Sequence, residues 1–312
     1  MTSRIKIFLT AFFLSLPFWL GVNFSQGAFE NFLYAQISRI PETSFVKIPK
    51  DLLKPKLELQ VRAALSSKFK VGEDEEFVYF EKNENTPLPI ASLTKLMTAL
   101  VILENPDDYD FSRAVTVSKK AASQDDVPNY GNLKAGESFK IKKLLDLMLV
   151  YSSNDAAYAM AEVIGPDNFA EKMNLKAKEL NLSNTHFVNP TGLDPEDLHF
   201  ASSTDAQTYF NYSTAKDLTT LSKYILKNYS LIFEISSNGG PYPTHNGISE
   251  ITVPADFMIL GGKTGNTDEA KGCLLVILVS HQGDTFINIV LGADGVKERV
   301  EEMQKLINWL AD

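Results

Sequence analysis

The chain has 312 residues, 44% hydrophobic and 22% charged, and this ordinary globular usage suffices for one large domain or two small ones. Its 39 acidic and 30 basic residues give a formal net charge of −9. Because no long run of lysine or arginine interrupts this acidic composition, nucleic-acid binding is disfavoured as the main function.

The first 27 residues have the pattern of an export signal. Arg4 and Lys6 precede an apolar stretch over residues 7–22. As a helix this stretch would span roughly 24 Å, at about 1.5 Å per residue, which is short of the ~30 Å hydrocarbon core of a bilayer. We therefore expect residues 1–27 to be a cleaved signal peptide or an N-terminal membrane anchor. The rest of the chain would then work outside the cytoplasm, in the periplasm or at the cell surface, with any membrane tether at its N-terminus.

Residues 28–56 contain three prolines among mixed polar residues, a composition typical of an extended linker. A folded domain is predicted over residues 57–312. It opens with two strands, at residues 57–65 and 77–80, followed by a helix over residues 92–103 whose apolar positions recur at helical spacing.

Helical patterns fill the middle of the domain, and strands return near its end. The expected helices cover residues 141–151, 154–164, 168–180 and 213–227, and the expected strands cover residues 257–260, 274–279 and 286–291, followed by a last helix over residues 296–310. This order predicts an α+β fold, in which a sheet forms from both ends of the domain and a helical block, roughly residues 105–230, is inserted between them.

Ser92 and Lys95 form the first motif that could carry chemistry. Side chains three residues apart share a helix face, and a serine needs a base beside it, which a lysine of lowered pKa can be. The same spacing also begins at four other serines, which we interpret as chance matches: Ser3, Ser44, Ser67 and Ser213. Ser92 is favoured because a helix starts there directly after a proline-marked loop, which directs backbone N–H groups toward the serine.

Two further motifs follow Ser92 in the chain. Ser152-Ser153-Asn154 lies between two predicted helices, where it can either enter an active site or cap the second helix. The same letters recur at residues 236–238, in a segment rich in glycine and proline. Lys263-Thr264-Gly265 follows a predicted strand and two glycines, which mark either close approach of another group or a plain turn.

The ordered set Ser-x-x-Lys, Ser-x-Asn and Lys-Thr-Gly resembles the signature of penicillin-binding proteins and serine β-lactamases. Its motifs begin 60 residues apart (92 to 152) and 111 residues apart (152 to 263). The flanking segments resemble the low-molecular-mass D-alanyl-D-alanine carboxypeptidases: residues 89–98, 152–157, 185–194 and 212–218. The resemblance covers residue 57 to the end. It implies a β-lactamase/D,D-peptidase-like fold, with an antiparallel sheet flanked by helices, an all-helical subdomain, and the active site between them.

The resemblance also implies roles for single residues. Ser92 would be the nucleophile, Lys95 its base, and Ser152 a proton relay to the leaving D-alanine. The remaining residues would bind substrate. Asn154 would hold Lys95 and the substrate amide. Lys263 would supply positive charge across the site and keep Lys95 neutral, and Thr264, next to Gly265 of the same motif, would bind the terminal carboxylate. The backbone N–H groups of Ser92 and Asn266 would form the oxyanion hole, and Arg299 matches a carboxylate-binding arginine by spacing.

The implied reaction removes the terminal D-alanine from peptidoglycan pentapeptide stems through an acyl-enzyme on Ser92. β-Lactam antibiotics would be covalent inhibitors, and no metal or cofactor is expected.

Three alternatives stay open: a D,D-endopeptidase acting on cross-links, a β-lactamase, and an inactive peptidoglycan-binding protein. The β-lactamase alternative is disfavoured because Ala177 stands four residues before Asn181, where class A enzymes have a glutamate. A longer stretch than usual in the family, residues 199–211, could reshape the rim of the site.

Overall fold

The structure is a computed structural model that describes residues 55–72, 75–124, 132–195, 210–237 and 248–311. The export signal at residues 1–27, the linker up to residue 54 and residues 199–209 of the longer stretch lie outside these ranges, and what was expected of them stays a prediction.

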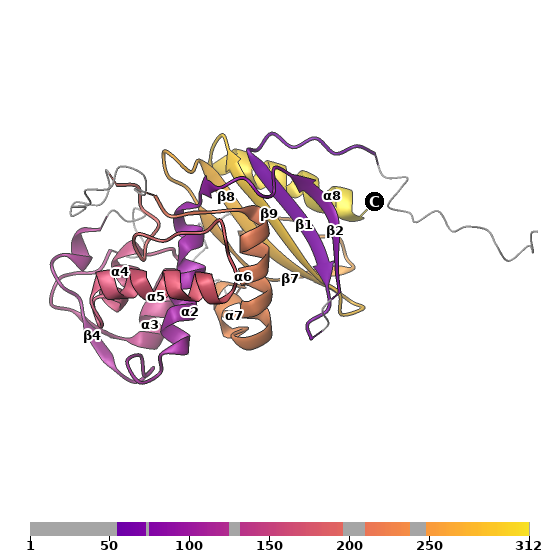
Figure 1. The fold of residues 1–312 in the computed structure, drawn as a ribbon. Coiled ribbons are helices and arrows are strands. Elements are labelled where there is room, and N and C mark those ends of the chain that lie inside the picture. Colours follow the sequence, from indigo (N-terminus) through magenta and orange to yellow (C-terminus); the bar gives the residue numbers. More distant parts are fainter. Residues whose placement is uncertain (1–54, 73–74, 125–131, 196–209, 238–247, 312) are drawn as a thin grey trace, which may run out of the picture. The chain divides into compact units, whose positions relative to one another are not determined.

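A five-stranded antiparallel sheet forms one layer of the fold, in the order β2-β1-β9-β8-β7 (Figure 1). Its strands are β1 (Ala63–Phe69), β2 (Glu76–Lys82), β7 (Phe257–Gly265), β8 (Gly272–Ser280) and β9 (Thr285–Ala293). Because β1 pairs with β9, the two ends of the domain meet in one sheet, as the sequence predicted.

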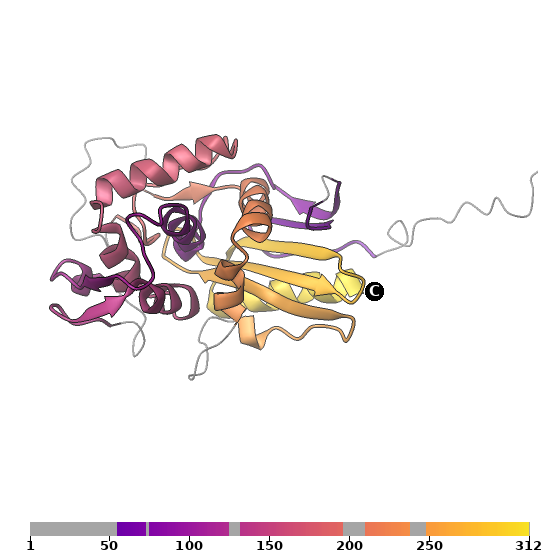
Figure 2. The same cartoon turned by 90° about the horizontal axis from the view of Figure 1, so that it is seen from below.

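Helices cover both faces of the sheet (Figure 2). On β8, Leu275 and Ile277 belong to the core shared with the helical layer, whereas Leu274 and Val276 pack in a second core with Met303 of α8 (Val296–Ala311). Successive side chains of a strand point to opposite faces, so a strand buried on both faces has a continuous apolar sequence rather than an alternating one. The face opposite α8 is covered by α6 (Ala215–Asn228) and α7 (Leu231–Ser237).

The helical layer surrounds α2 (Thr94–Glu104), in which every side chain from residue 94 to residue 102 is buried. A helix that is apolar all round requires neighbours on every side. These neighbours include α3 (Ile141–Val150), α4 (Asn154–Ala161), α5 (Pro166–Glu179) and α7. The remaining elements are short: β3 (Leu88–Pro89), β4 (Ala114–Thr116), β5 (Ser138–Lys140), β6 (Tyr212–Ser213), and 3-10 turns at Ala91–Leu93, Ala121–Ser123 and Ile248–Glu250.

Four details differ from the sequence prediction. The segment between residues 105 and 230 is not all-helical, because β4 and β5 pair as a two-stranded antiparallel sheet within it. The first strand covers Ala63–Phe69 rather than residues 57–65, and its second half was not predicted because it contains Ser66 and Ser67, polar residues that are nevertheless buried. Helix α7 was not predicted, and Ser236 and Ser237 end this helix instead of lying in a loop. Helix α6 starts at Ala215 rather than residue 213, and Thr214 caps it, since the Thr214 side chain accepts from the backbone N–H of Asp217.

The fold class is confirmed as α+β, with an antiparallel sheet flanked by helices. Within the described ranges, no helix is both long and apolar enough to cross a lipid bilayer.

Candidate active site

A strained turn presents Ser92 just before α2. Ser92 lies in the 3-10 turn Ala91–Leu93, and Ala91 has a φ of +46°. This left-handed conformation costs a non-glycine residue roughly 1–3 kcal/mol and persists only where the surroundings enforce it. Ser92 is partly exposed, whereas its neighbours Ala91 and Leu93 are buried. The turn therefore leaves the serine hydroxyl accessible from outside the core.

Two glycines allow distant segments to pack against this turn. A Cβ at Gly265, the last residue of β7, would lie 2.8 Å from the carbonyl oxygen of Ile90 and 3.1 Å from the nitrogen of Ser92. A Cβ at Gly192 would lie only 2.0 Å from the carbonyl oxygen of Ala91. Any larger residue at either position would displace the Ser92 turn, so the close approach of the two backbones requires glycine at both positions.

Lys95 lies one helical turn after Ser92 and points back to it. Its Nζ is 2.8 Å from the Ser92 Oγ, 2.6 Å from the Asn154 Oδ1 and 2.8 Å from the carbonyl oxygen of Thr191. The Lys95 side chain is fully buried, and the three oxygens are all uncharged. Burial favours the neutral form of an amine, which is the form able to accept a proton.

The two adjacent serines of the second motif have different partners. Ser153 caps α4 by accepting from the backbone N–H of Ala156 at 3.1 Å. Ser152 has a φ of +62°, and its hydroxyl accepts a hydrogen bond from the Nζ of Lys263 at 2.8 Å. The helix-capping interpretation therefore holds for Ser153. Its neighbours have other partners, since Ser152 contacts Lys263 and Asn154 contacts Lys95.

Lys263 is a second buried lysine, only 1% exposed. Burial holds the pKa of Lys263 well below its ordinary value, and the positive charges of Lys95 and Arg299 lower this pKa further. Its Nζ also donates to the carbonyl oxygen of Thr264 at 2.9 Å. The residue lies within β7, which continues through the whole Lys-Thr-Gly motif, so that motif is strand and not a turn.

Arg299 reaches the same place from α8. Its Nη1 donates to the carbonyl oxygen of Gly265 at 2.8 Å, and the residue is 4% exposed. Burial lowers the pKa of Arg299, and its Nε has no hydrogen-bond partner in the described part of the chain. Among the described residues, neither Arg299 nor Lys263 forms an ion pair. A buried guanidinium beside a buried lysine, with no ion pair to either among the described residues, leaves this end of β7 electropositive.

The remaining residues of the third motif differ in exposure. Thr264 is 5% exposed, whereas Asn266, directly after the strand, is exposed. The structure thus joins Ser92, Lys95 and Asn154 in one hydrogen-bonded group and Ser152 and Lys263 in a second. It connects Arg299 to the end of β7 through Gly265.

The rejected Ser-x-x-Lys matches have other surroundings. Ser67 is a buried residue of β1, and its hydroxyl has no partner within the described ranges. Ser213 lies in β6, where its hydroxyl shares a hydrogen bond with that of Thr185. Ser3 and Ser44 lie outside the described residues.

Sequence reasoning missed the carbonyl of Thr191 and the residues that hold it. The Oδ1 of Asn189 accepts from the N–H of Thr191, the hydroxyl of Thr191 and the N–H of Gly192. The side chain of Asn211 connects this turn to Thr94, beside Lys95 on α2. The sequence signal that could have pointed to these residues is the segment 185–194, which resembles the carboxypeptidase family but to which no role was assigned.

Comparisons with known proteins identify the family of this chain. Residues 68–295 match the model of peptidase family S11, described as D-alanyl-D-alanine carboxypeptidase. The D-alanyl-D-alanine carboxypeptidase DacF of Bacillus subtilis is 34% identical over 244 residues, which cover 74% of this chain and 58% of the relative. A D-alanyl-D-alanine endopeptidase of Pseudomonas aeruginosa is 28% identical over 265 residues, covering 81% of this chain and 79% of the relative.

Among solved structures, penicillin-binding protein D2 of Listeria monocytogenes in its cefotaxime-bound form superposes with a TM-score of 0.65 at 27% identity. The match covers 83% of this chain and 100% of that one. By contrast, the chain spans less than three fifths of the length of the Bacillus subtilis relative.

Proposed function

We propose a function from one premise: the chain belongs to the D-alanyl-D-alanine carboxypeptidase family. It is a serine D,D-peptidase that removes the terminal D-alanine from peptidoglycan stem peptides, and it acts outside the cytoplasm. The observation that carries this proposal is the 2.8 Å contact between the Oγ of a partly exposed Ser92 and the Nζ of a fully buried Lys95. A serine is activated by a base within this distance.

The chemistry proceeds through an acyl-enzyme. As the Ser92 Oγ bonds to the carbonyl carbon of the penultimate D-alanine, Lys95 takes the hydroxyl proton. The C–N bond to the last D-alanine breaks, and the leaving amine receives a proton by way of Ser152. Water then attacks the ester, which releases the shortened peptide and frees the Ser92 hydroxyl. The backbone N–H groups of Ser92 and Asn266 stabilise the oxyanion, and one such donor is worth roughly 10²–10³ in rate.

The charges at the end of β7 indicate which end of a peptide binds. Lys263 and Arg299 are buried and lack a carboxylate partner among the described residues. A substrate carboxylate held by Thr264 would pair with the charge of Arg299 and favour the protonated form of Lys263. This favours a free C-terminal D-alanine, and Arg299 would act on it through Gly265 as well as through its charge.

Two alternatives use the same residues. The Pseudomonas aeruginosa relative is named an endopeptidase, which supports cross-link cleavage as the second candidate. A β-lactamase needs a base for deacylation, but Ala177 is buried in α5 and Glu179 pairs with Lys176. β-Lactams would therefore form an acyl-enzyme that lasts minutes or longer.

The deciding experiment incubates the purified chain, and its Ser92→Ala variant, with muropeptides and with a fluorescent penicillin. Mass spectrometry should find pentapeptides shortened by one D-alanine and the penicillin bound to the peptide that contains Ser92. The variant should do neither. Cleaved cross-links with intact pentapeptides would favour the endopeptidase, and labelling that survives Ser92→Ala would reject the nucleophile.

A further inference from the structure

We propose that Asn189 is a positioning residue for Lys95, acting through the backbone carbonyl of Thr191. This inference rests on the proposed function, since it concerns the base that activates Ser92. It assigns a role to the turn of residues 188–193, which reaches Ser92 through Lys95.

The argument starts from the hydrogen-bond geometry of an amine. A neutral lysine has two N–H donors and one lone pair, and only the lone pair can take the proton of Ser92. The Asn154 Oδ1, at 2.6 Å, and the Thr191 carbonyl oxygen, at 2.8 Å, are acceptors without a hydrogen to donate. When these two oxygens receive the two N–H groups of the neutral amine, its lone pair is left facing the Ser92 Oγ at 2.8 Å.

The carbonyl of Thr191 is useful only if the turn is rigid, and Asn189 makes it so. One oxygen, the Oδ1 of Asn189, accepts hydrogen bonds of 3.0 and 2.9 Å from Thr191 and 2.7 Å from Gly192, and a longer one of 3.5 Å from Asn211. The Nδ2 of Asn189 donates to the carbonyl of Leu193 at 3.1 Å. Since Asn189 is 5% exposed, solvent does not replace these bonds when the side chain is removed.

The turn is also fastened to the helix that carries Lys95. Asn211 donates from its Nδ2 to the hydroxyl of Thr94 and to the carbonyl of Asn189. The hydroxyl of Thr98 donates to the carbonyl of Pro190 at 2.7 Å. The turn therefore keeps a fixed position relative to α2, and Asn189 determines where within it the Thr191 carbonyl points.

The test compares Asn189→Ala with Asn189→Asp in the full chain. Acylation by fluorescent penicillin is measured from pH 5 to pH 10, with saturation used to separate binding from the acylation step. For Asn189→Ala we expect the maximal acylation rate to fall by about 10²-fold with little change in binding, because a misplacement near 1 Å costs about that much.

Asn189→Asp has the same shape and retains an oxygen that accepts the bonds from Thr191 and Gly192, but it loses the donor to the carbonyl of Leu193. Its maximal rate should therefore fall by no more than about tenfold, the effect of one hydrogen bond. Its added negative charge favours protonated Lys95 and should move the acid limb of the profile to higher pH. The ionisable groups on the surrounding elements are Lys263 on β7, Asp155 on α4 and Asp194 after the turn, and both variants leave them unchanged.

Asn174→Ala is the matched control. Asn174 braces the same segment farther from Lys95, accepting from the N–H of Phe187 at 2.9 Å and donating to its carbonyl at 2.7 Å. It should lose similar thermal stability without a change in acylation rate.

The outcomes separate the two proposals. A parent chain that never acylates rejects the proposed function. If the parent acylates and Asn189→Ala acylates as fast as the parent, only the role of Asn189 is overturned. That role is also overturned if Asn174→Ala slows acylation as much as Asn189→Ala does. If Asn189→Ala does not fold, an unshifted acid limb in Asn189→Asp overturns that role instead.

Discussion

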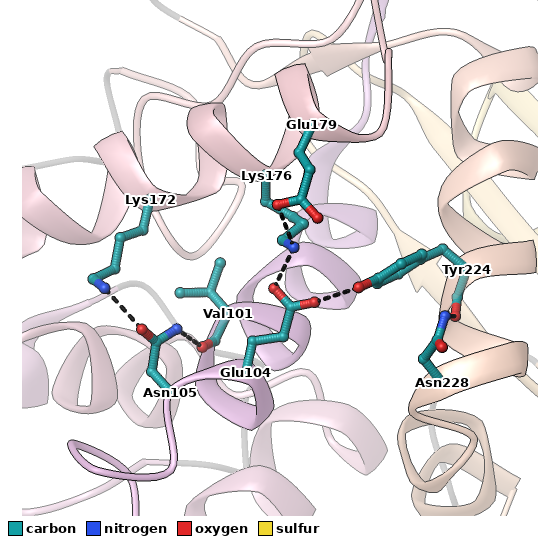
Figure 3. Close-up of polar contacts among 8 residues, drawn as sticks. All are labelled: Val101, Glu104, Asn105, Lys172, Lys176, Glu179, Tyr224 and Asn228. Carbon is teal, nitrogen blue, oxygen red and sulfur yellow. Dashed lines mark hydrogen bonds and ion pairs between the residues drawn. The ribbon is translucent and has the colours of Figure 1, made fainter.

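A lysine that is largely shielded from water lies at each end of α2, but the groups that contact the two lysines are opposite in kind. At the N-terminal end, Lys95 contacts the hydroxyl and carbonyl oxygens of Ser92, Asn154 and Thr191. At the C-terminal end, Lys176 of α5 lies 2.7 Å from carboxylate oxygens of both Glu104 and Glu179 (Figure 3).

The carboxylates decide the protonation state at the C-terminal end. Burial alone would lower the pKa of Lys176, but Glu104 and Glu179 raise it above the ordinary value. Lys263, which has no such partner in the described part of the chain, has a pKa well below that value. A lysine is therefore a fixed cation where carboxylates contact it, whereas burial without an ion pair makes a lysine such as Lys263 easier to deprotonate.

The largest expected effect tests whether the two ends differ in chemistry. Lys95→Arg should lower acylation by penicillin by about 10²–10⁴-fold, because a guanidinium stays protonated and cannot act as a base. Lys176→Arg should retain near-parental acylation, since an arginine can still pair with Glu104. Stopped-flow acylation kinetics of both variants provide the check, and equal losses would remove the distinction between the two ends.

A carboxylate introduced beside Lys95 should make its surroundings resemble those of Lys176. Asn154→Asp places a charge where the Oδ1 now lies 2.6 Å from Nζ, and this should raise the pKa of Lys95. We expect about 10²-fold slower acylation at pH 7, with recovery as pH rises toward the new pKa. A variant equally slow at every pH would show that Asn154 acts by shape and not by leaving Lys95 uncharged.

The free energy of unfolding should change in opposite directions when Lys263 and Lys176 are each replaced by methionine. A buried lysine of lowered pKa destabilises the fold at neutral pH, so Lys263→Met should raise the free energy of unfolding by about 1 kcal/mol or more while abolishing activity. Lys176→Met should lower it by about 1–3 kcal/mol because Glu104 loses a charged partner. Urea unfolding at pH 7 measures both, and changes of equal sign would contradict this account.

The smallest effect concerns Tyr224 of α6, whose hydroxyl donates to the Oε1 of Glu104 at 2.8 Å (Figure 3). Tyr224→Phe should cost about 1 kcal/mol at pH 7. Burial and the hydrogen bond to Glu104 raise the pKa of Tyr224 to about 12.

The unfolded chain releases the Tyr224 proton near pH 10 while the folded chain keeps it, so the contribution of Tyr224 to stability is lost as pH rises from about 10 to 12. The difference between parent and variant should therefore narrow over that range in pH-dependent unfolding. A difference that stays constant would mean that the phenol does not titrate with folding.

Side-chain motifs could be predicted from the sequence because their residue types are specific to the chemistry. Ser92, Lys95 and Lys263 were identified because a nucleophile, a base and a cation recur at fixed spacing. The carbonyl of Thr191 could not be found in this way, since every residue has a carbonyl and only the fold decides where it points. Asn189 was hidden for the same reason, because its partners are backbone groups.

The fold was predictable where apolar periodicity is strong. The hairpin of β8 and β9 and the last helix lie close to their predicted positions. The second half of β1 was missed because Ser66 satisfies its hydroxyl with the Oδ1 of Asn288, a contact between residues 222 positions apart. Helix α7 was missed because its seven residues precede a segment rich in glycine and proline.

The all-round burial of α2 has a consequence for how this family diversifies. Residues 94–102 contact neighbours on every side, so a substitution there disturbs several helices at once. Asn266, at the end of β7, is exposed and can change without disturbing the core. New substrate preferences should therefore accumulate beside β7 during divergence, while the helix that carries the base drifts slowly.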